Sequence, residues 1–331
     1  MLSPRRAEAL RPALDRFVAG FDAAARLGFD PVEVPRRYPD PGDAEVAGLL
    51  AASLAYGRAD LFKPRLEAVL SAMGPSPAAF AETFARAPDA RAFAFFRYRF
   101  NRPADVAALV AAAGSLRARH GSLGARFAAL LAEEGARPGG SREPLRRALA
   151  RFAAELREAP PVAGLLRRRG RRGLLHLLPD AGGAGACKRW NLYLRWMVRG
   201  PDAVDLGLWG GVPRSALLVP LDTHVARIGR CLGLTRRRDL SWRTAEDITG
   251  SLRRLDPEDP VRYDFALCHL GMSGACPARR DPGRCRTCPL LEVCLAGRVS
   301  AARPGAPARG GPGRRRPAAP AGSGSGRSRR W

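Results

Sequence analysis

The amino-acid sequence predicts an all-α protein, and three observations support this prediction. Apolar residues recur at spacings of three and four along most of the chain, no segment alternates apolar and polar residues as a half-buried strand does, and prolines and glycines separate the periodic segments. Hydrophobic residues make up 46% of the 331 residues, which is enough for a packed core. We therefore expect helices, without a β-sheet, as far as residue 298.

The expected helices follow one another at short intervals. Residues 1–29 have helical spacing, and a proline-rich loop then leads to Asp43, which is placed to cap a helix that ends near Tyr56. After Lys188, another helix runs to the stop signal Gly200-Pro201. Between them we expect helices at about 61–73, 77–86, 103–119, 121–134 and 144–157.

The charge of the chain favours a polyanionic partner, nucleic acid first. The net charge is +25 and the pI is near 11.4. Residues 303–331 hold eight arginines and no acidic residue, so +17 remains for the rest, and a composition rich in Ala, Arg, Gly and Pro indicates that GC-rich codon usage contributes. We expect residues 299–331 to be a disordered basic tail, either a solvated appendage or a nonspecific tether for phosphates.

No segment indicates membrane insertion. No apolar run reaches the length of about 18 residues that a membrane helix needs. The first residues, Met1 to Arg6, lack the apolar region of a signal peptide. We expect a cytoplasmic, nucleoid-associated monomer.

Two lysines, Lys63 and Lys188, stand among 56 basic residues. This chain uses arginine almost wherever it needs a positive charge. A lysine that it retains therefore indicates a position where an amine is needed. An amine can lose its proton and act as a nucleophile, whereas a guanidinium stays charged. This contrast makes Lys188 a candidate for covalent chemistry, with a phosphate contact as the alternative.

Four cysteines are concentrated near the C-terminal end, in the pattern C-x8-C-x2-C-x5-C. Four thiolates within 19 residues can surround one metal centre, and a cytosolic chain uses such a set for metal rather than disulfides. A zinc ribbon usually has two separated CxxC pairs, whereas one pair with flanking single cysteines suits a [4Fe–4S] cluster. We expect a [4Fe–4S] cluster, with zinc as the alternative, on Cys276, Cys285, Cys288 and Cys294.

Two further segments carry polar residues at expected helix starts. Asp222 or Thr223 can cap a helix that has Val225 on its apolar face, so the minimal interpretation of Asp222 is a helix cap. Upstream, Leu178-Pro179 leads into a glycine-rich turn that ends at Lys188. Glycines let backbone N–H groups approach a phosphate at a helix N-terminus.

These segments together resemble the helix-hairpin-helix (HhH-GPD) DNA glycosylase superfamily, in particular its endonuclease III and adenine glycosylase branch. The cysteines are similar to that branch's C-terminal cluster loop, with a first gap of eight residues where six is usual. Asp222-Thr223-His224 resembles its V-D-T-H-[IV]-x-R motif. The turn before Lys188 resembles its L-P-G-[IV]-G-x-[KT] hairpin, with residues inserted after the proline and the lysine one place late.

The resemblance implies roles for particular residues. In bifunctional members of the superfamily, a lysine in the place of Lys188 attacks the sugar and forms a Schiff base, and an aspartate in the place of Asp222 stabilises the developing positive charge. Tyr56 and Arg58 stand where the superfamily probes the gap left by an extruded base, although a packed helix end is the preferred interpretation. The residues assigned to nucleic-acid binding are Gly183, Gly185, Arg189, Tyr56, Arg58, Arg195 and His224.

The chain resembles even more closely the DUF2400 family of bacterial proteins of unknown function. The family strings A-Y-G-R, C-K-R-x-N-x-[YF]-L-R-W-M-V-R, D-L-G-L-W and P-L-D-T-H have counterparts between about residues 43 and 294. The counterparts are Ala55 to Arg58, Cys187 to Arg199, Asp205 to Trp209 and Pro220 to His224.

These resemblances imply a two-lobed HhH-GPD DNA glycosylase-like fold over residues 1–298. The hairpin is expected at about 174–199, the aspartate segment at 219–232 and the cluster loop at 276–294, with Lys188 and Asp222 in the cleft. The implied function is a DNA glycosylase with abasic-site lyase activity on damaged or mismatched bases. The alternatives are a noncatalytic DNA- or RNA-binding iron–sulfur protein and a monofunctional glycosylase in which Asp222 activates water.

Overall fold

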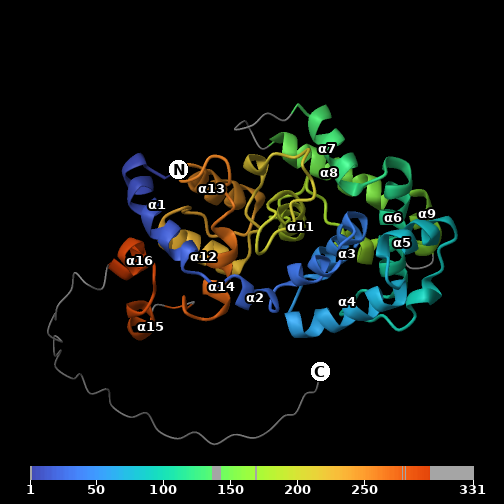
Figure 1. The fold of residues 1–331 in the computed structure, drawn as a ribbon, viewed down its shortest axis with the longest axis horizontal. Coiled ribbons are helices and arrows are strands. Elements are labelled where there is room, and N and C mark those ends of the chain that lie inside the picture. The colour runs from blue at the N-terminus through green and yellow to red at the C-terminus, as the bar shows by residue number, and fades with distance from the viewer. Residues whose placement is uncertain (1, 136–142, 168–169, 278, 280, 299–331) are drawn as a thin grey trace, which may run out of the picture.

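The computed structural model describes residues 2–135, 143–167, 170–277, 279 and 281–298 (Figure 1). Within these residues all regular secondary structure is helical, and two β-bridges, Tyr98 with Asn101 and Gly185 with Ser241, are isolated pairs. The prediction of an all-α protein is therefore confirmed. The expected disordered tail, 299–331, lies outside the described residues.

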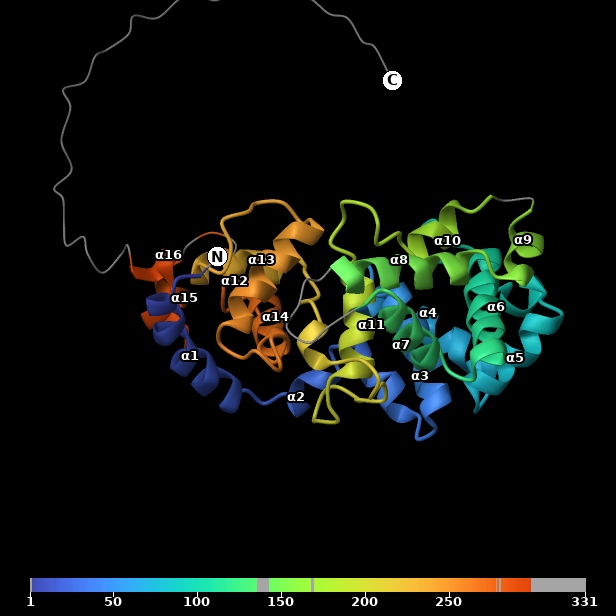
Figure 2. The ribbon, with the colours of Figure 1, turned by 90° about the horizontal axis from the view of Figure 1, so that it is seen from above.

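The helices form two groups on either side of α11 (Figures 1 and 2). The first group unites the N-terminal helix with helices from the last third of the chain. Arg6 on α1 joins these distant segments, since its guanidinium donates to the carbonyl of Leu232 at 3.1 Å and to that of Val293. The first group comprises α1 (Pro4–Ala19), α2 (Ala24–Leu27), α12 (Thr223–Leu232), α13 (Trp242–Arg253), α14 (Asp264–Met272), α15 (Pro282–Arg286), η5 (Leu291–Val293) and α16 (Leu295–Arg298).

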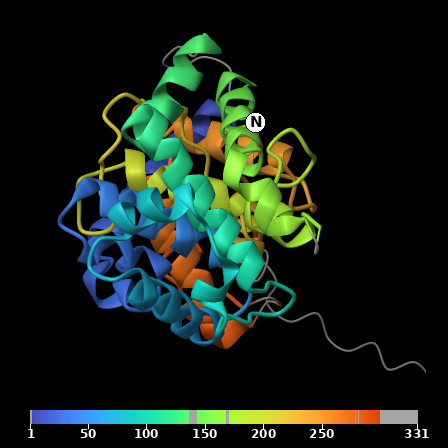
Figure 3. The same ribbon diagram turned by 90° about the vertical axis from the view of Figure 1, so that its right-hand side faces the viewer.

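The second group, which faces the viewer in Figure 3, is built around α6. Residues 106–113 of α6 are all buried. Small side chains let neighbours approach α6 from several directions. At Gly114 a Cβ atom would lie only 1.9 Å from the carbonyl oxygen of Ala81, so α5 packs directly on this glycine. The second group comprises η1 (Pro31–Glu33), η2 (Pro35–Arg37), α3 (Pro41–Leu54), α4 (Ala59–Met73), α5 (Pro77–Arg86), η3 (Ala90–Phe93), α6 (Pro103–His120), α7 (Leu123–Glu133), α8 (Glu143–Arg157), α9 (Pro160–Leu166) and α10 (Arg172–Leu177).

Helix α11 (Lys188–Val198) lies between the two groups, and its residues 190–198 are all buried. It packs on α3, where a Cβ atom at Gly48 would lie 2.6 Å from the Cε atom of Met197. A connection that includes η4 (Arg214–Ala216) leads from α11 to α12. One continuous apolar core runs through both groups, so α11 is a shared central element.

The predicted helix positions hold closely, with one correction at a cap. The helices expected at 61–73, 77–86, 103–119, 121–134 and 144–157 each begin and end within two residues of α4 to α8. The helix expected after Asp43 begins earlier, because Pro41 occupies its first turn and Asp40 is its N-cap. The carboxylate of Asp40 accepts from Asp43 N at 2.9 Å, while Asp43 itself accepts from Ala78 N at 2.8 Å and so stabilises the start of α5.

The N-terminal segment also differs from expectation. Residues 1–29 were expected to continue one helical pattern, but α1 ends at Ala19, where Gly20 is the C-cap, and α2 is a separate single turn. Among the described residues, no helix combines the length and the hydropathy that crossing a bilayer requires.

Candidate functional site

Lys188 is the first residue of α11, and the preceding turn is held in place by the rest of the fold. Arg146 on α8 donates to the carbonyls of Ala181, Gly182 and Gly183 at 2.9, 3.1 and 2.8 Å. Cys187, the N-cap residue, has a φ of 48°, a left-handed conformation that turns the chain sharply into the helix. The position of Lys188 is therefore fixed from both sides.

Asp222 is the N-cap of α12, as one of the two sequence interpretations proposed. Its Oδ1 accepts hydrogen bonds from the backbone N–H groups of His224 and Val225, both at 2.9 Å. Only this oxygen is occupied by the cap, which leaves Oδ2 free to face other side chains. The helix cap and a chemical role are therefore compatible in one carboxylate.

The structure brings Lys188 and Asp222 together, although 34 residues separate them in the sequence. The Nζ atom of Lys188 lies 3.3 Å from Asp222 Oδ2, and the two side chains are 36% and 14% exposed. Burial works to lower the pKa of Lys188, but the Asp222 carboxylate outweighs it and the pKa is raised. Burial works to raise the pKa of Asp222, but Lys188 and the Val225 N–H outweigh it and the pKa is lowered. At neutral pH the pair rests as an ammonium and a carboxylate.

Cys268 on α14 is a third member of this group, which the sequence pattern did not identify. Its Sγ donates to Asp222 Oδ2 at 3.6 Å. Burial raises the thiol pKa well above its ordinary value, so Cys268 is a neutral donor. The carboxylate that faces Lys188 is thus oriented by a second contact.

A pocket opens beside Lys188, and six segments form its walls. It spans about 660 Å³, including its open mouth, between η1, the end of α3, the start of α4, α11, Pro220 and α14. Phe62 and Phe265 are buried in its walls, whereas Phe29 is 62% exposed and Met272 is 45% exposed. Apolar, partly aromatic walls with a few polar groups are typical of sites for flat organic ligands.

Buried charged side chains also line the pocket, among them Asp30, Arg195 and Asp264. Arg195 donates to Asp205 Oδ1 at 3.1 Å and to Asp264 Oδ2 at 2.5 Å, and all three side chains are buried. Burial raises the pKa of Asp264 to about 6, against the opposing effect of Arg195. Burial works to raise the pKa of Asp30 as well, but His269 and Arg195 outweigh it and the pKa is lowered. Arg195, predicted to bind nucleic acid, is therefore a buried, ion-paired side chain that lines this pocket.

Tyr56 and Arg189 form one packed unit at the end of α3. The guanidinium of Arg189 lies 5.5 Å from the ring centre of Tyr56 and donates to Ser53 O at 2.8 Å and to His176 O. The hydroxyl of Tyr56 donates to Asn101 Oδ1 at 2.5 Å. Both side chains are half-buried and engaged with protein, as the packed interpretation of Tyr56 proposed.

Arg58, Gly183, Gly185 and His224 occupy different surroundings. Arg58 is 78% exposed and pairs with Asp60 at 2.6 Å. Gly183 and Gly185 are exposed, and a Cβ atom at Gly185 would meet no atom within 4 Å, so the space before this turn is open. His224 packs against Gly271 of α14, where an added Cβ would lie 2.6 Å from the His224 Cβ. The sequence Arg167 to Arg172 before this turn holds five arginines, and its residues 168 and 169 lie outside the described residues.

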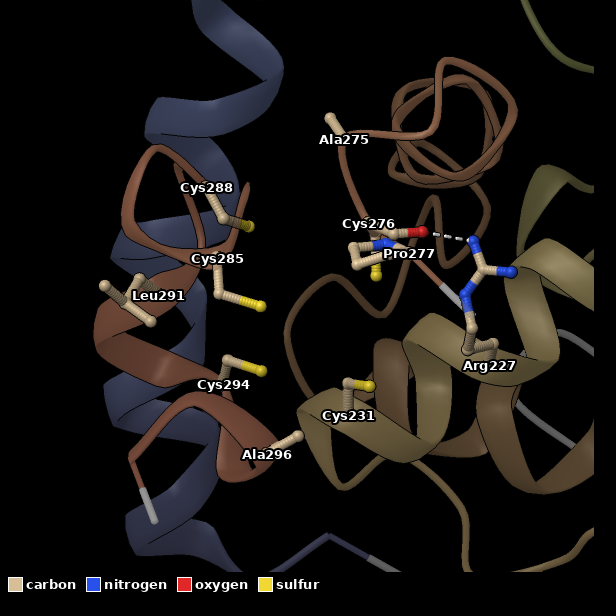
Figure 4. Close-up of a pocket in the computed structure, with 10 residues that line it drawn as sticks. All are labelled: Arg227, Cys231, Ala275, Cys276, Pro277, Cys285, Cys288, Leu291, Cys294 and Ala296. Carbon is tan, nitrogen blue, oxygen red and sulfur yellow. Dashed lines mark hydrogen bonds between the residues drawn. The ribbon is translucent and has the colours of Figure 1, made fainter. Parts of the chain in front are cut away.

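The four clustered cysteines line one hollow near the end of the described chain (Figure 4). Cys285, Cys288 and Cys294 stand along one wall, and their sulfurs face Cys276 on the other side. A fifth cysteine, Cys231 of α12, lines the same hollow. The sequence pattern did not include it, because it lies 45 residues before Cys276.

The donor set of this hollow fits a soft metal centre. Thiols are the ligands of iron–sulfur clusters and of structural zinc. Among the described residues, no three His, Cys, Asp or Glu side chains lie close enough to hold a metal ion as they stand. A single zinc with Zn–S bonds of about 2.3 Å draws its sulfurs to within about 4 Å of one another, whereas a four-iron cluster occupies a wider space. The thiols that line the hollow are thus suitable ligands for either kind of centre.

A known family matches most of the chain. A family described as "Protein of unknown function (DUF2400)" matches residues 30–273. The matched range includes Lys188, Asp222 and Cys268 but ends before Cys276. No curated protein and no solved structure matches the chain.

Proposed function

The chain belongs to the DUF2400 family. From the candidate site around Lys188 and Asp222, we propose that the protein is a DNA glycosylase with abasic-site lyase activity. We propose further that its fold is a variant of the helix-hairpin-helix glycosylase fold. One observation carries the proposal: Lys188 lines a partly aromatic pocket and its Nζ lies 3.3 Å from the carboxylate of Asp222. An amine, a carboxylate and a pocket for a flat ring are the groups that excision of an extruded base requires.

The proposed reaction begins with the amine of Lys188. Its neutral Nζ attacks C1′ of the deoxyribose, the bond from C1′ to the base breaks, and the base departs with the bonding electron pair and takes up a proton. Asp222 stabilises the positive charge that develops on the sugar. Ring opening then gives an iminium between Nζ and C1′, from which elimination of the 3′ phosphate cleaves the strand.

The resting charges set a condition on this reaction. Lys188 is an ammonium in the free protein, so it must lose a proton before it attacks. Solvent takes up this proton, and Asp222 Oδ2, 3.3 Å from Nζ, stays a carboxylate that can stabilise the charge on the sugar. Cys268 donates to the same oxygen, so the three groups form one hydrogen-bonded unit beside the pocket.

Binding of DNA is proposed to use the surface before the hairpin turn. The space before Gly185 is open, and the turn leads into α11, whose N-terminal N–H groups can bind a phosphate. The net charge of +25 supplies sequence-independent affinity. A [4Fe–4S] cluster on Cys276, Cys285, Cys288 and Cys294 is proposed to hold the last segment of the chain beside α12.

A second candidate function is favoured by the raised pKa of Lys188. A permanently charged lysine would contact a phosphate, and Asp222, which stays ionised, would activate water for base release without strand cleavage. Both candidates place the same carboxylate at the sugar. They differ in whether a covalent intermediate forms.

Borohydride trapping on a duplex with one abasic site tests the proposal without knowledge of the damaged base. Reduction of the iminium links the protein covalently to DNA, and Lys188→Arg should abolish the product while DNA binding persists, since arginine keeps the charge but cannot form an imine. The chain provides a matched control, because its other lysine, Lys63, does not line the pocket and its Nζ is engaged by Glu33 and by the carbonyl of Gly28. Lys63→Arg should trap like the wild type. If Lys188→Arg traps equally well, the lysine mechanism is wrong.

A further inference from the structure

With Cys231, the cysteine hollow holds five thiols, which is one more than a [4Fe–4S] cluster binds. Such a cluster takes four cysteine ligands, whereas five cysteines line this hollow (Figure 4). Cys285, Cys288 and Cys294 occupy one wall, and the opposite wall presents both Cys276 and Cys231. One of these two thiols is therefore left without an iron.

The position of Cys231 is held by secondary structure. It lies in the last turn of α12, and its side chain is hydrogen-bonded to the side chain of Cys276. One helical turn earlier, Arg227 donates to the carbonyl of Cys276 at 2.5 Å and so fastens the cluster loop to the same helix. The contact between the two thiols thus follows from how α12 meets the loop.

The surroundings distinguish the two thiols. Cys276 lies in the same stretch of 19 residues as Cys285, Cys288 and Cys294, and the bond from Arg227 to its carbonyl holds it at the hollow. Cys231 lies on α12, outside that stretch, and its side chain contacts that of Cys276. We infer that Cys276 binds the fourth iron and that Cys231 stays a thiol whose S–H donates a hydrogen bond to the Cys276 sulfur.

This assignment gives Cys231 a functional effect. Hydrogen bonds to cluster sulfurs are among the factors that set the reduction potential of an iron–sulfur cluster. A donor stabilises the reduced cluster more than the oxidised one, because the reduced cluster carries one more negative charge. Cys231 therefore raises the reduction potential without contributing an iron ligand.

The inference rests on the proposed iron–sulfur cluster, and the experiment separates the two. Wild type, Cys231→Ala, Cys231→Ser, Cys276→Ala and the control Cys187→Ala, a cysteine outside the hollow, are purified anaerobically. Iron per chain, absorption near 400 nm and the midpoint potential in a mediated titration are measured, with circular dichroism to check folding.

We expect four irons per chain in wild type, Cys231→Ala and Cys187→Ala, and loss of iron in Cys276→Ala. Cys231→Ala should have a lower potential than wild type, and Cys231→Ser, which keeps a donor, should restore it. An unchanged potential in Cys231→Ala overturns the inference alone. Loss of iron in both folded Cys231 variants with retention in Cys276→Ala also overturns it, since Cys231 would then be the ligand. A wild type without iron overturns the proposed cluster as well.

Discussion

Replacement of Asp222 separates its capping role from its chemical role, because each role uses a different oxygen. Oδ1 accepts the His224 and Val225 N–H groups at 2.9 Å, and Oδ2 faces Lys188 at 3.3 Å. Asp222→Asn keeps a carbonyl oxygen for the cap but removes the negative charge. Asp222→Ala removes both.

The stability changes follow from these contacts. Loss of an N-cap side chain costs about 1 kcal/mol. An ion pair whose lysine is 36% exposed contributes at most about 1 kcal/mol, because solvent screens most of the Coulomb energy. We expect Asp222→Asn to lose about 1 kcal/mol and Asp222→Ala about 2 kcal/mol. At roughly 2–4 °C per kcal/mol, the two thermal midpoints should differ by a few degrees.

The activity changes should not follow the same order. Both variants lack the carboxylate charge, so both should lose about 10²-fold or more in the single-turnover rate of trapping on an abasic duplex. DNA binding should persist in both. Asp40→Asn is the matched control, since Asp40 caps α3 through one backbone N–H at 2.9 Å, away from the pocket. A fully active Asp222→Asn would refute the electrostatic role, and equal destabilisation by Asn and Ala would refute the assignment of Oδ1 as the cap.

Three further predictions concern the nucleophile, the tail and the cluster. If Lys188 attacks, its raised pKa leaves a small neutral fraction that grows with pH, so the trapping rate should rise about tenfold per pH unit between about pH 6 and 9. Since the pKa of Asp222 is lowered, its carboxylate is already ionised throughout that window, and base release by activated water would be flat there. DNA affinity should fall steeply with salt, with a slope of log K against log salt concentration of about −0.9 per phosphate contact. Deletion of 303–331 should lessen this slope without removing any lesion preference. A salt-independent affinity would contradict nucleic-acid binding. The wild type should be brown, and Cys285→Ser should bleach it, whereas a colourless wild type with one zinc per chain would disprove the cluster.

The helices themselves were predictable from local signals. The boundaries of α4 to α8 follow from apolar spacing and from the prolines and glycines between them, because capping and backbone restrictions act within about one turn. The misplaced cap at Asp43 shows the limit of this reasoning, since Asp40 and Asp43 are both suitable and only Pro41 decides where the helix begins. The sequence pattern also predicted that Asp222 caps a helix. The resemblance to the glycosylase superfamily predicted that Lys188 lies in the same cleft as Asp222.

The sequence by itself determined the all-α architecture, the four clustered thiols and the two polar residues at helix starts. Each of these depends on residues a few positions apart, or on a resemblance in a short string. Only the tertiary structure showed that Cys268 contacts Asp222, that Asp30 lines the pocket and that Cys231 lines the thiol hollow. These side chains come from segments tens or hundreds of residues away, and they meet because α12, α14 and η1 pack against a common core. Helical periodicity encodes which face of each helix is buried, but not which face of another helix it meets.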